Sequence, residues 1–161
     1  MESPQFESIT LDKALSVKNR LAGRLAQART NVETYNCVVA GQRESTVDVR
    51  AEYERMTVLQ EALVAVKAAI QRANGPILED VYRLGEAKSV MQMLNGLNTK
   101  QGPEPGYNGV TYDYASTFLK PEVLETVRRL EGRVDEIQDR INSHNAMTRI
   151  ELPAAVLDLA R

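Results

Sequence analysis

The sequence contains no tryptophan, one cysteine and one histidine, and aromatic residues make up only 5% of its 161 residues. A core with so few rings has to be built from aliphatic and alanine side chains, which is typical of packed helices. A single cysteine, Cys37, excludes an intrachain disulfide framework, and beside Val38 and Val39 we expect an inert or half-buried thiol. One cysteine and one histidine also exclude the usual zinc-binding spacings, and we predict neither a metal nor a cofactor.

The chain also lacks an excess of charge of one sign and a long apolar run. Its 20 basic and 22 acidic residues are mixed along the sequence, so no basic field favours nucleic acid as a partner. No stretch approaches the roughly 18 apolar residues of a membrane span, and Met1–Phe6 does not resemble a signal peptide. We therefore expect one soluble, cytoplasmic domain over residues 1–161 without a transmembrane segment.

No catalytic motif is present. The chain has neither a GxGxxG turn nor a GxxxxGK[ST] loop, and its acidic residues are spread along predicted helix faces. Cys37 and His144 form the only Cys–His combination, and their spacing does not support a catalytic pair. We expect His144 to be cationic or hydrogen-bonding next to the carbonyl end of the helix that it terminates, and we predict a protein that is not an enzyme.

Two long amphipathic helices are predicted over residues 10–74. Thr10 is a suitable N-cap for the first, a turn is expected at Ala40–Thr46, and Asn74-Gly75-Pro76 ends the second. Apolar residues recur in steps of three and four, which places them on one face of each helix. Similar lengths and a short connection predict an antiparallel hairpin. Its apolar stripes include Leu21, Leu25, Val32, Met56, Leu63 and Ile70.

The second half of the chain predicts a helix over 77–98, a flexible loop over 99–109, a strand–helix–strand unit over 110–152 and a tail over 153–161. The loop is rich in glycine and proline. Val110–Tyr114 and Met147–Leu152 alternate as short strands, which we expect to pair with each other or with a neighbouring subunit. Pro121 favours a helix start. A heptad follows at Val123, Val127, Leu130, Val134, Ile137 and Ile141.

The predicted fold class is therefore mainly α, a long hairpin and two further helices with a small two-stranded β element. Each hairpin helix can cover only part of the apolar side of the other. Since the helices are also long for a domain of this size, we expect self-association through the remaining stripes, with closed symmetry.

Several sequence fragments resemble the septicolysin-like family of bacterial proteins. They are Leu11-x-x-Ala14-Leu15-x-x-Lys18-x-x-Leu21-x-x-Arg24-Leu25, Asn36-x-Val38-x-x-Gly41, Ile70-x-Arg72-x-Asn74 and Arg140-Ile141-x-x-x-Asn145-x-x-Thr148. The order of elements is similar from about Leu11 to Leu152, while Arg43 and Ala146 depart from the family pattern. The resemblance implies an oligomer built from helical hairpins, with no secure biochemical activity, and the family name suggests a cytolysin.

Three functional hypotheses follow. The first is a non-enzymatic oligomeric scaffold or interaction protein, assembled through coiled-coil-like seams of the stripe and heptad residues. The second is an oligomeric module that sequesters a small anionic, nucleotide-like ligand between subunits, because tyrosine and arginine suit such surfaces. The third, a membrane-active cytolysin, rests on the family name alone. The candidate ligand-binding residues are Tyr107, Tyr112, Tyr114, Arg140, His144 and Arg149.

Overall fold

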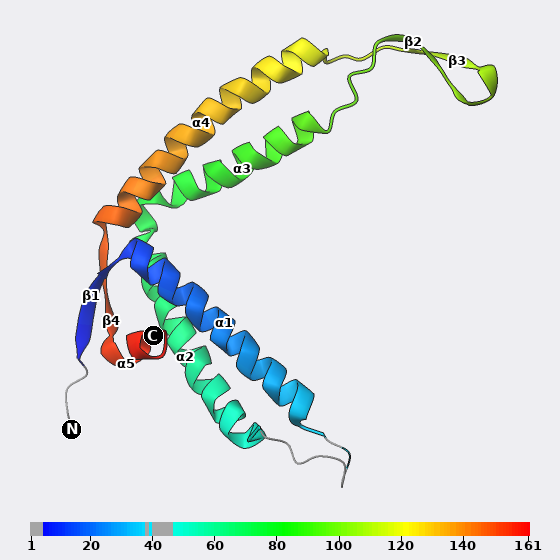
Figure 1. Cartoon of the computed structure of the whole chain (residues 1–161). Helices are drawn as coiled ribbons and strands as arrows, with labels where there is room; N and C mark the ends of the chain where they lie inside the picture. The colour runs from blue at the N-terminus through cyan, green and yellow to red at the C-terminus, as the bar shows by residue number, and fades with distance from the viewer. Residues whose placement is uncertain (1–4, 38, 40–46) are drawn as a thin grey trace. The chain divides into compact units, whose positions relative to one another are not determined.

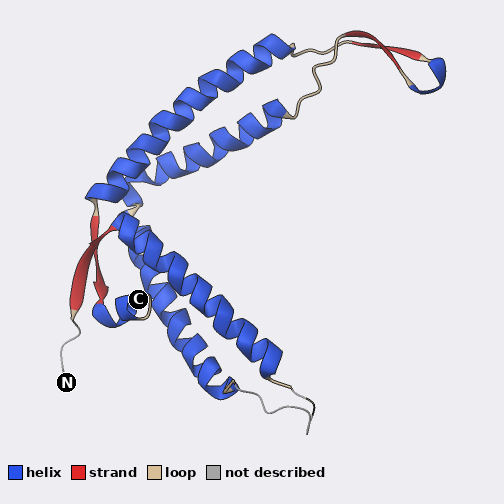
Figure 2. Ribbon diagram, in the orientation of Figure 1, coloured by secondary structure: helices blue, strands red, loops and turns tan. Residues whose placement is uncertain are grey.

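The computed structural model describes residues 5–37, 39 and 47–161, and the predicted turn at Ala40–Thr46 lies outside this range. The described part is mainly helical with a minor β component, which confirms the predicted fold class (Figures 1 and 2). The elements in order are β1 (Phe6–Thr10), α1 (Leu11–Tyr35), α2 (Val49–Ala73), the 3-10 turn Gly75–Ile77, α3 (Leu78–Asn95), β2 (Gly102–Pro105), the 3-10 turn Tyr107–Gly109, β3 (Thr111–Tyr114), α4 (Lys120–Met147), β4 (Arg149–Pro153) and α5 (Ala154–Asp158).

The contacts within the chain group into two compact units, whereas the sequence analysis treats residues 1–161 as one domain. The first unit comprises Met1–Pro76 with His144–Arg161, and the second comprises Ile77–Ser143. The first unit therefore contains the α1–α2 hairpin, β1, β4 and α5, and the second contains α3, β2, β3 and most of α4.

Local capping explains where the hairpin helices begin. The Thr10 side chain accepts from the amide of Lys13 at 3.4 Å, as predicted for an N-cap. The α2 helix is capped by Asp48, whose Oδ1 accepts from the amides of Arg50 and Ala51. In both cases a side-chain oxygen satisfies donors that have no partner inside the helix.

The core of the first unit lies where the hairpin meets the β1–β4 sheet and α5. Leu11, Leu21, Leu59, Val66 and Leu152 are almost completely buried there. Each such side chain contributes roughly 1.5–3 kcal/mol by leaving water. The buried face of α1 also includes Ala14, Val17 and Ala28, while Leu15 and Leu25 are only half-buried and Tyr35 is exposed.

The predicted strand pairing is wrong. The strand expected at Val110–Tyr114 does form as β3, but it pairs with β2 inside the segment predicted to be a flexible loop. The strand expected at Met147–Leu152 forms as β4 and pairs with β1, which the sequence analysis missed. Both pairings are antiparallel and lie within one chain. A two-stranded ribbon has only edge strands, and this position tolerates the prolines of β2.

The second unit is built on α3 and α4. Glu122 accepts from the amide of Leu119 at 2.8 Å, which satisfies a donor at the start of α4 and accords with the predicted helix start at Pro121. Val123, Val127, Ile137 and Ile141 are the buried residues of α4, and they share the predicted heptad face. None of the residues of α3 is fully buried.

Candidate interaction sites

A groove runs between α1 and α2 on one side of the hairpin. It is open and has a volume of about 480 Å³. Its walls carry two exposed alanines, Ala22 and Ala26, and its half-buried or buried floor includes Leu25, Met56 and Leu63. Arg29 is its one charged lining residue and Gln60 its one polar lining residue. We call this surface, lined by Ala22, Leu25, Ala26, Arg29, Met56, Gln60 and Leu63, the hairpin groove.

The predicted seam residues divide into two groups. Six have little contact with water because their own chain covers them, and these are Leu21, Leu63, Ile70, Val127, Ile137 and Ile141. The others keep part of their surface accessible, and these are Leu25, Val32, Met56, Leu130 and Val134. Leu25 and Met56 of this second group lie in the hairpin groove, as does the buried Leu63.

The three candidate tyrosines gather on residues 102–114, which we call the tip ribbon. Its two strands pair in the register Gly102↔Tyr114 to Pro105↔Thr111. Tyr107 is 87% exposed and Tyr112 is 52% exposed, so both rings are accessible. The ring of Tyr112 lies over Gly106, where an added Cβ would approach a ring carbon to 2.2 Å.

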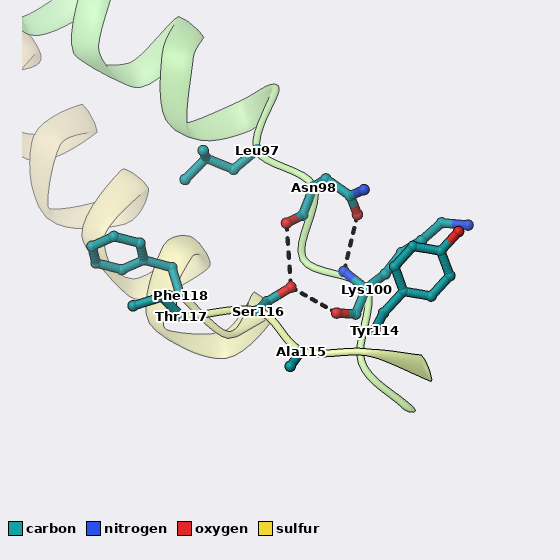
Figure 3. Close-up of a pocket in the computed structure, with 8 residues that line it drawn as sticks. All are labelled: Leu97, Asn98, Lys100, Tyr114, Ala115, Ser116, Thr117 and Phe118. Atoms are coloured by element: carbon teal, nitrogen blue, oxygen red, sulfur yellow. Dashed lines mark hydrogen bonds between the residues drawn. The ribbon is translucent and has the colours of Figure 1, made fainter. Parts of the chain in front are cut away.

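A hollow of about 330 Å³ lies at the base of the tip ribbon (Figure 3). Leu97 and Phe118 lie on one side of it, and Lys100 and Tyr114 on the other. The Lys100 ammonium lies 5.0 Å from the centre of the Tyr114 ring, within cation–π range, and also forms an ion pair with Glu104. This hydrogen bond raises the pKa of Lys100, so the ammonium stays charged but is already paired.

Ser116 fixes the turn that closes this hollow. Its hydroxyl lies 2.6 Å from the Lys100 carbonyl oxygen and 3.4 Å from that of Asn98, and its single proton is donated to the nearer one. Its amide donates to the side chain of Gln101 at 2.8 Å. The hollow thus combines a polar rim fixed by hydrogen bonds with two apolar side chains, and its ammonium is already paired.

Arg140 is engaged in an ion pair between α3 and α4. Its Nη2 and Nε donate to the two carboxylate oxygens of Asp80 at 2.8 and 3.0 Å. The hydrogen bond from Arg140 lowers the pKa of Asp80, and the same contact raises the pKa of Arg140. Arg140 is 20 residues beyond Lys120, roughly 30 Å along the helix from the end of α4 that follows the tip ribbon, so the structure does not bring it to the tyrosines.

His144 and Arg149 belong to the first unit, not to the unit that holds the tyrosines. His144 Nε2 lies 3.1 Å from the carbonyl oxygen of Ala73, which can only accept, so this nitrogen carries the proton. The sequence places His144 at the carbonyl end of its own helix, whereas the carbonyl that it contacts belongs to Ala73, at the end of α2. Arg149 donates to the hydroxyl and carbonyl oxygens of Ser8 on the neighbouring strand. Both side chains thus serve local structure.

Three further predictions concern the burial of Cys37, metal binding and membrane-spanning helices. Cys37 is exposed, so the expectation of an inert or half-buried thiol is wrong about burial; the residue lies beyond the end of α1 at Tyr35. Among residues 5–37, 39 and 47–161, no three His, Cys, Asp or Glu side chains come together in a metal-binding cluster. None of the helices in the same range has the length and apolar character needed to cross a membrane.

Several residues of these surfaces could not be predicted from the sequence. Ala22 and Ala26 were not singled out because alanine fits any helix face, although their spacing of four is a signal for a shared face. Lys100 and Ser116 act through contacts with Tyr114 and with backbone carbonyls that only folding reveals.

Comparison with known proteins finds no family model, no curated protein and no solved structure that matches this chain significantly.

Proposed function

We propose that this protein is a non-enzymatic scaffold or interaction protein that assembles into homo-oligomers through its helices. The hairpin groove supports this proposal, because it is an open, largely apolar surface between two packed helices. Small alanine side chains on its wall allow a third helix to approach closely, and the leucine and methionine floor offers ridges to pack against. A helix of a second copy would fill it, in keeping with the closed symmetry common among oligomers.

The remaining parts of this proposal rest on the sequence. The resemblance to the septicolysin-like family implies the same kind of assembly. A cytoplasmic location suits the exposed, unpaired thiol of Cys37, because thiols stay reduced there. Arg140 and Arg149 already donate to Asp80 and Ser8, so the structure offers no specific support for the small anionic ligand.

The test is a charge placed in the groove without disturbing the core. Ala26 is exposed on the groove wall, and glutamate is a good helix former, so Ala26→Glu keeps the hairpin folded while opposing a docked helix. The matched control is Ala68→Glu, because Ala68 is an exposed alanine of α2 that does not line the groove. Charges at Leu63 or Ile137 would be less informative, because both are buried in the chain itself.

The expected result is that light scattering gives an oligomer mass for the wild type and for Ala68→Glu, and a lower mass for Ala26→Glu. Circular dichroism should show the same helical content in all three. A wild type that stays monomeric at high concentration, or an Ala26→Glu variant with unchanged mass and helicity, would contradict assembly through the groove.

A further inference from the structure

The tip ribbon has one blocked edge and one open edge. In an antiparallel pair, residues alternate between positions that exchange both backbone hydrogen bonds and positions that exchange none. The amide of Gly106 donates to the carbonyl of Val110, so this pair is of the bonded kind. Residues two positions apart along a strand pair in the same way, so Glu104↔Tyr112 and Gly102↔Tyr114 are also hydrogen-bonded pairs.

The alternate pairs are Pro103↔Asp113 and Pro105↔Thr111, whose backbone groups face outward. Proline has no N–H to donate to the opposite strand, so Pro103 and Pro105 fit at these outward-facing positions. The outer edge of β2 therefore lacks donors at both positions. The outer edge of β3 keeps the N–H and C=O groups of Thr111 and Asp113. Within the described part of the chain, neither of these two amides donates a hydrogen bond.

We propose that the open edge of β3 pairs antiparallel with β3 of a second copy, centred on Tyr112. Thr111 then lies opposite Asp113 of the second copy, and each such pair exchanges both backbone hydrogen bonds. Tyr112 lies opposite its own symmetry mate. Val110, which is extended and 49% exposed, lies opposite Tyr114.

Side-chain chemistry favours this register, and it favours a second copy of the chain as the source of the pairing strand. Centred on Tyr112, the contact joins two aromatic rings, two pairs of valine with tyrosine, and a threonine hydroxyl that can donate to a carboxylate, all favourable cross-strand combinations. Centred on Asp113, the next register along, the same strand would place two carboxylates opposite each other, which is destabilising. Centred on Tyr112, the strand is thus complementary to itself, as a two-fold contact requires.

The β3–β3 pairing would be one intersubunit contact of the oligomer. It rests on the proposed function, because that function supplies the second copy. It is separate from the hairpin groove, because it uses residues of the second unit only. The two contacts can therefore be tested independently.

The test is disulfide trapping. Cys37 is exposed and must first be replaced by serine. In that background, Tyr112→Cys places two thiols at a pair with a Cα separation of about 4.5 Å, at the lower end of the roughly 4.4–6.8 Å that a disulfide spans. Mild oxidation should give at least tenfold more covalent dimer than Thr111→Cys alone. A mixture of Thr111→Cys and Asp113→Cys proteins should crosslink to each other.

A second comparison uses the outward amide of Asp113. In the Tyr112→Cys protein, Asp113→Pro removes that donor without touching the inner ladder, so crosslinking should fall strongly, while Asp113→Ala should retain it. If light scattering shows an oligomer but Tyr112→Cys crosslinks no faster than Thr111→Cys, the strand pairing is wrong and the helical assembly stands. If the wild type is monomeric and no disulfide forms, both proposals fail.

Discussion

At the scale of single residues, the Asp80–Arg140 ion pair has a definite pH dependence. Since Arg140 lowers the pKa of Asp80, the pair stabilises the fold above the unfolded-state pKa of about 4 and loses this effect as the pH falls through the lowered value. Asp80→Asn should lower the denaturation midpoint at pH 7, and the difference from wild type should vanish in acid. Added salt should reduce it too, because Arg140 is half exposed.

The control for this pair is Asp135→Asn, which changes an exposed aspartate of α4 that forms no ion pair with any residue the structure describes. It should have little effect at either pH. Denaturation curves of the three proteins at neutral and acidic pH measure both effects. A constant difference between wild type and Asp80→Asn across this range would show that the ion pair contributes nothing to stability.

A second residue-scale prediction concerns glycine. At Gly106 an alanine methyl would overlap the Tyr112 ring and come within 3.0 Å of the Val110 carbonyl oxygen. Gly106→Ala should therefore displace the ring into solvent, which NMR detects as loss of contacts between the Tyr112 ring and residue 106. Gly132→Ala provides the contrast, because Gly132 lies inside α4 with open space around it. That change should stabilise the protein by roughly 0.5–1 kcal/mol.

At the scale of elements, the hairpin predicts unequal costs for two leucines of the same helix. Leu21 is completely buried, so Leu21→Ala should cost roughly 2–5 kcal/mol by removing buried atoms and leaving a cavity. Leu25 is half-buried in the groove, and Leu25→Ala should cost about 1 kcal/mol. Urea denaturation at low protein concentration measures both values. Equal costs would mean that the groove side of α1 is as well covered as its core side.

The elements also show what the sequence can predict. Helix positions followed from apolar periodicity and caps such as Thr10, because these signals are local. Strand partners did not follow, because β1 and β4 are separated by most of the chain and Pro103 and Pro105 read as loop residues. Tyr107, Tyr112 and Tyr114 are neighbours in sequence and lie on one ribbon, whereas Arg140, His144 and Arg149 were grouped with them on residue type alone. Their actual partners depend on packing between distant segments.

For the whole molecule, the proposed assembly links stability to concentration. If a second copy binds only the folded chain, then raising the protein concentration favours the folded state by mass action. The wild type and Ala68→Glu should show a melting temperature that rises over a hundredfold increase in concentration. Ala26→Glu should lose most of this dependence, since its charged side chain stands where a helix would dock. A melting temperature that does not change with concentration for the wild type would indicate a chain that folds without a partner, and the hairpin groove would then need another occupant.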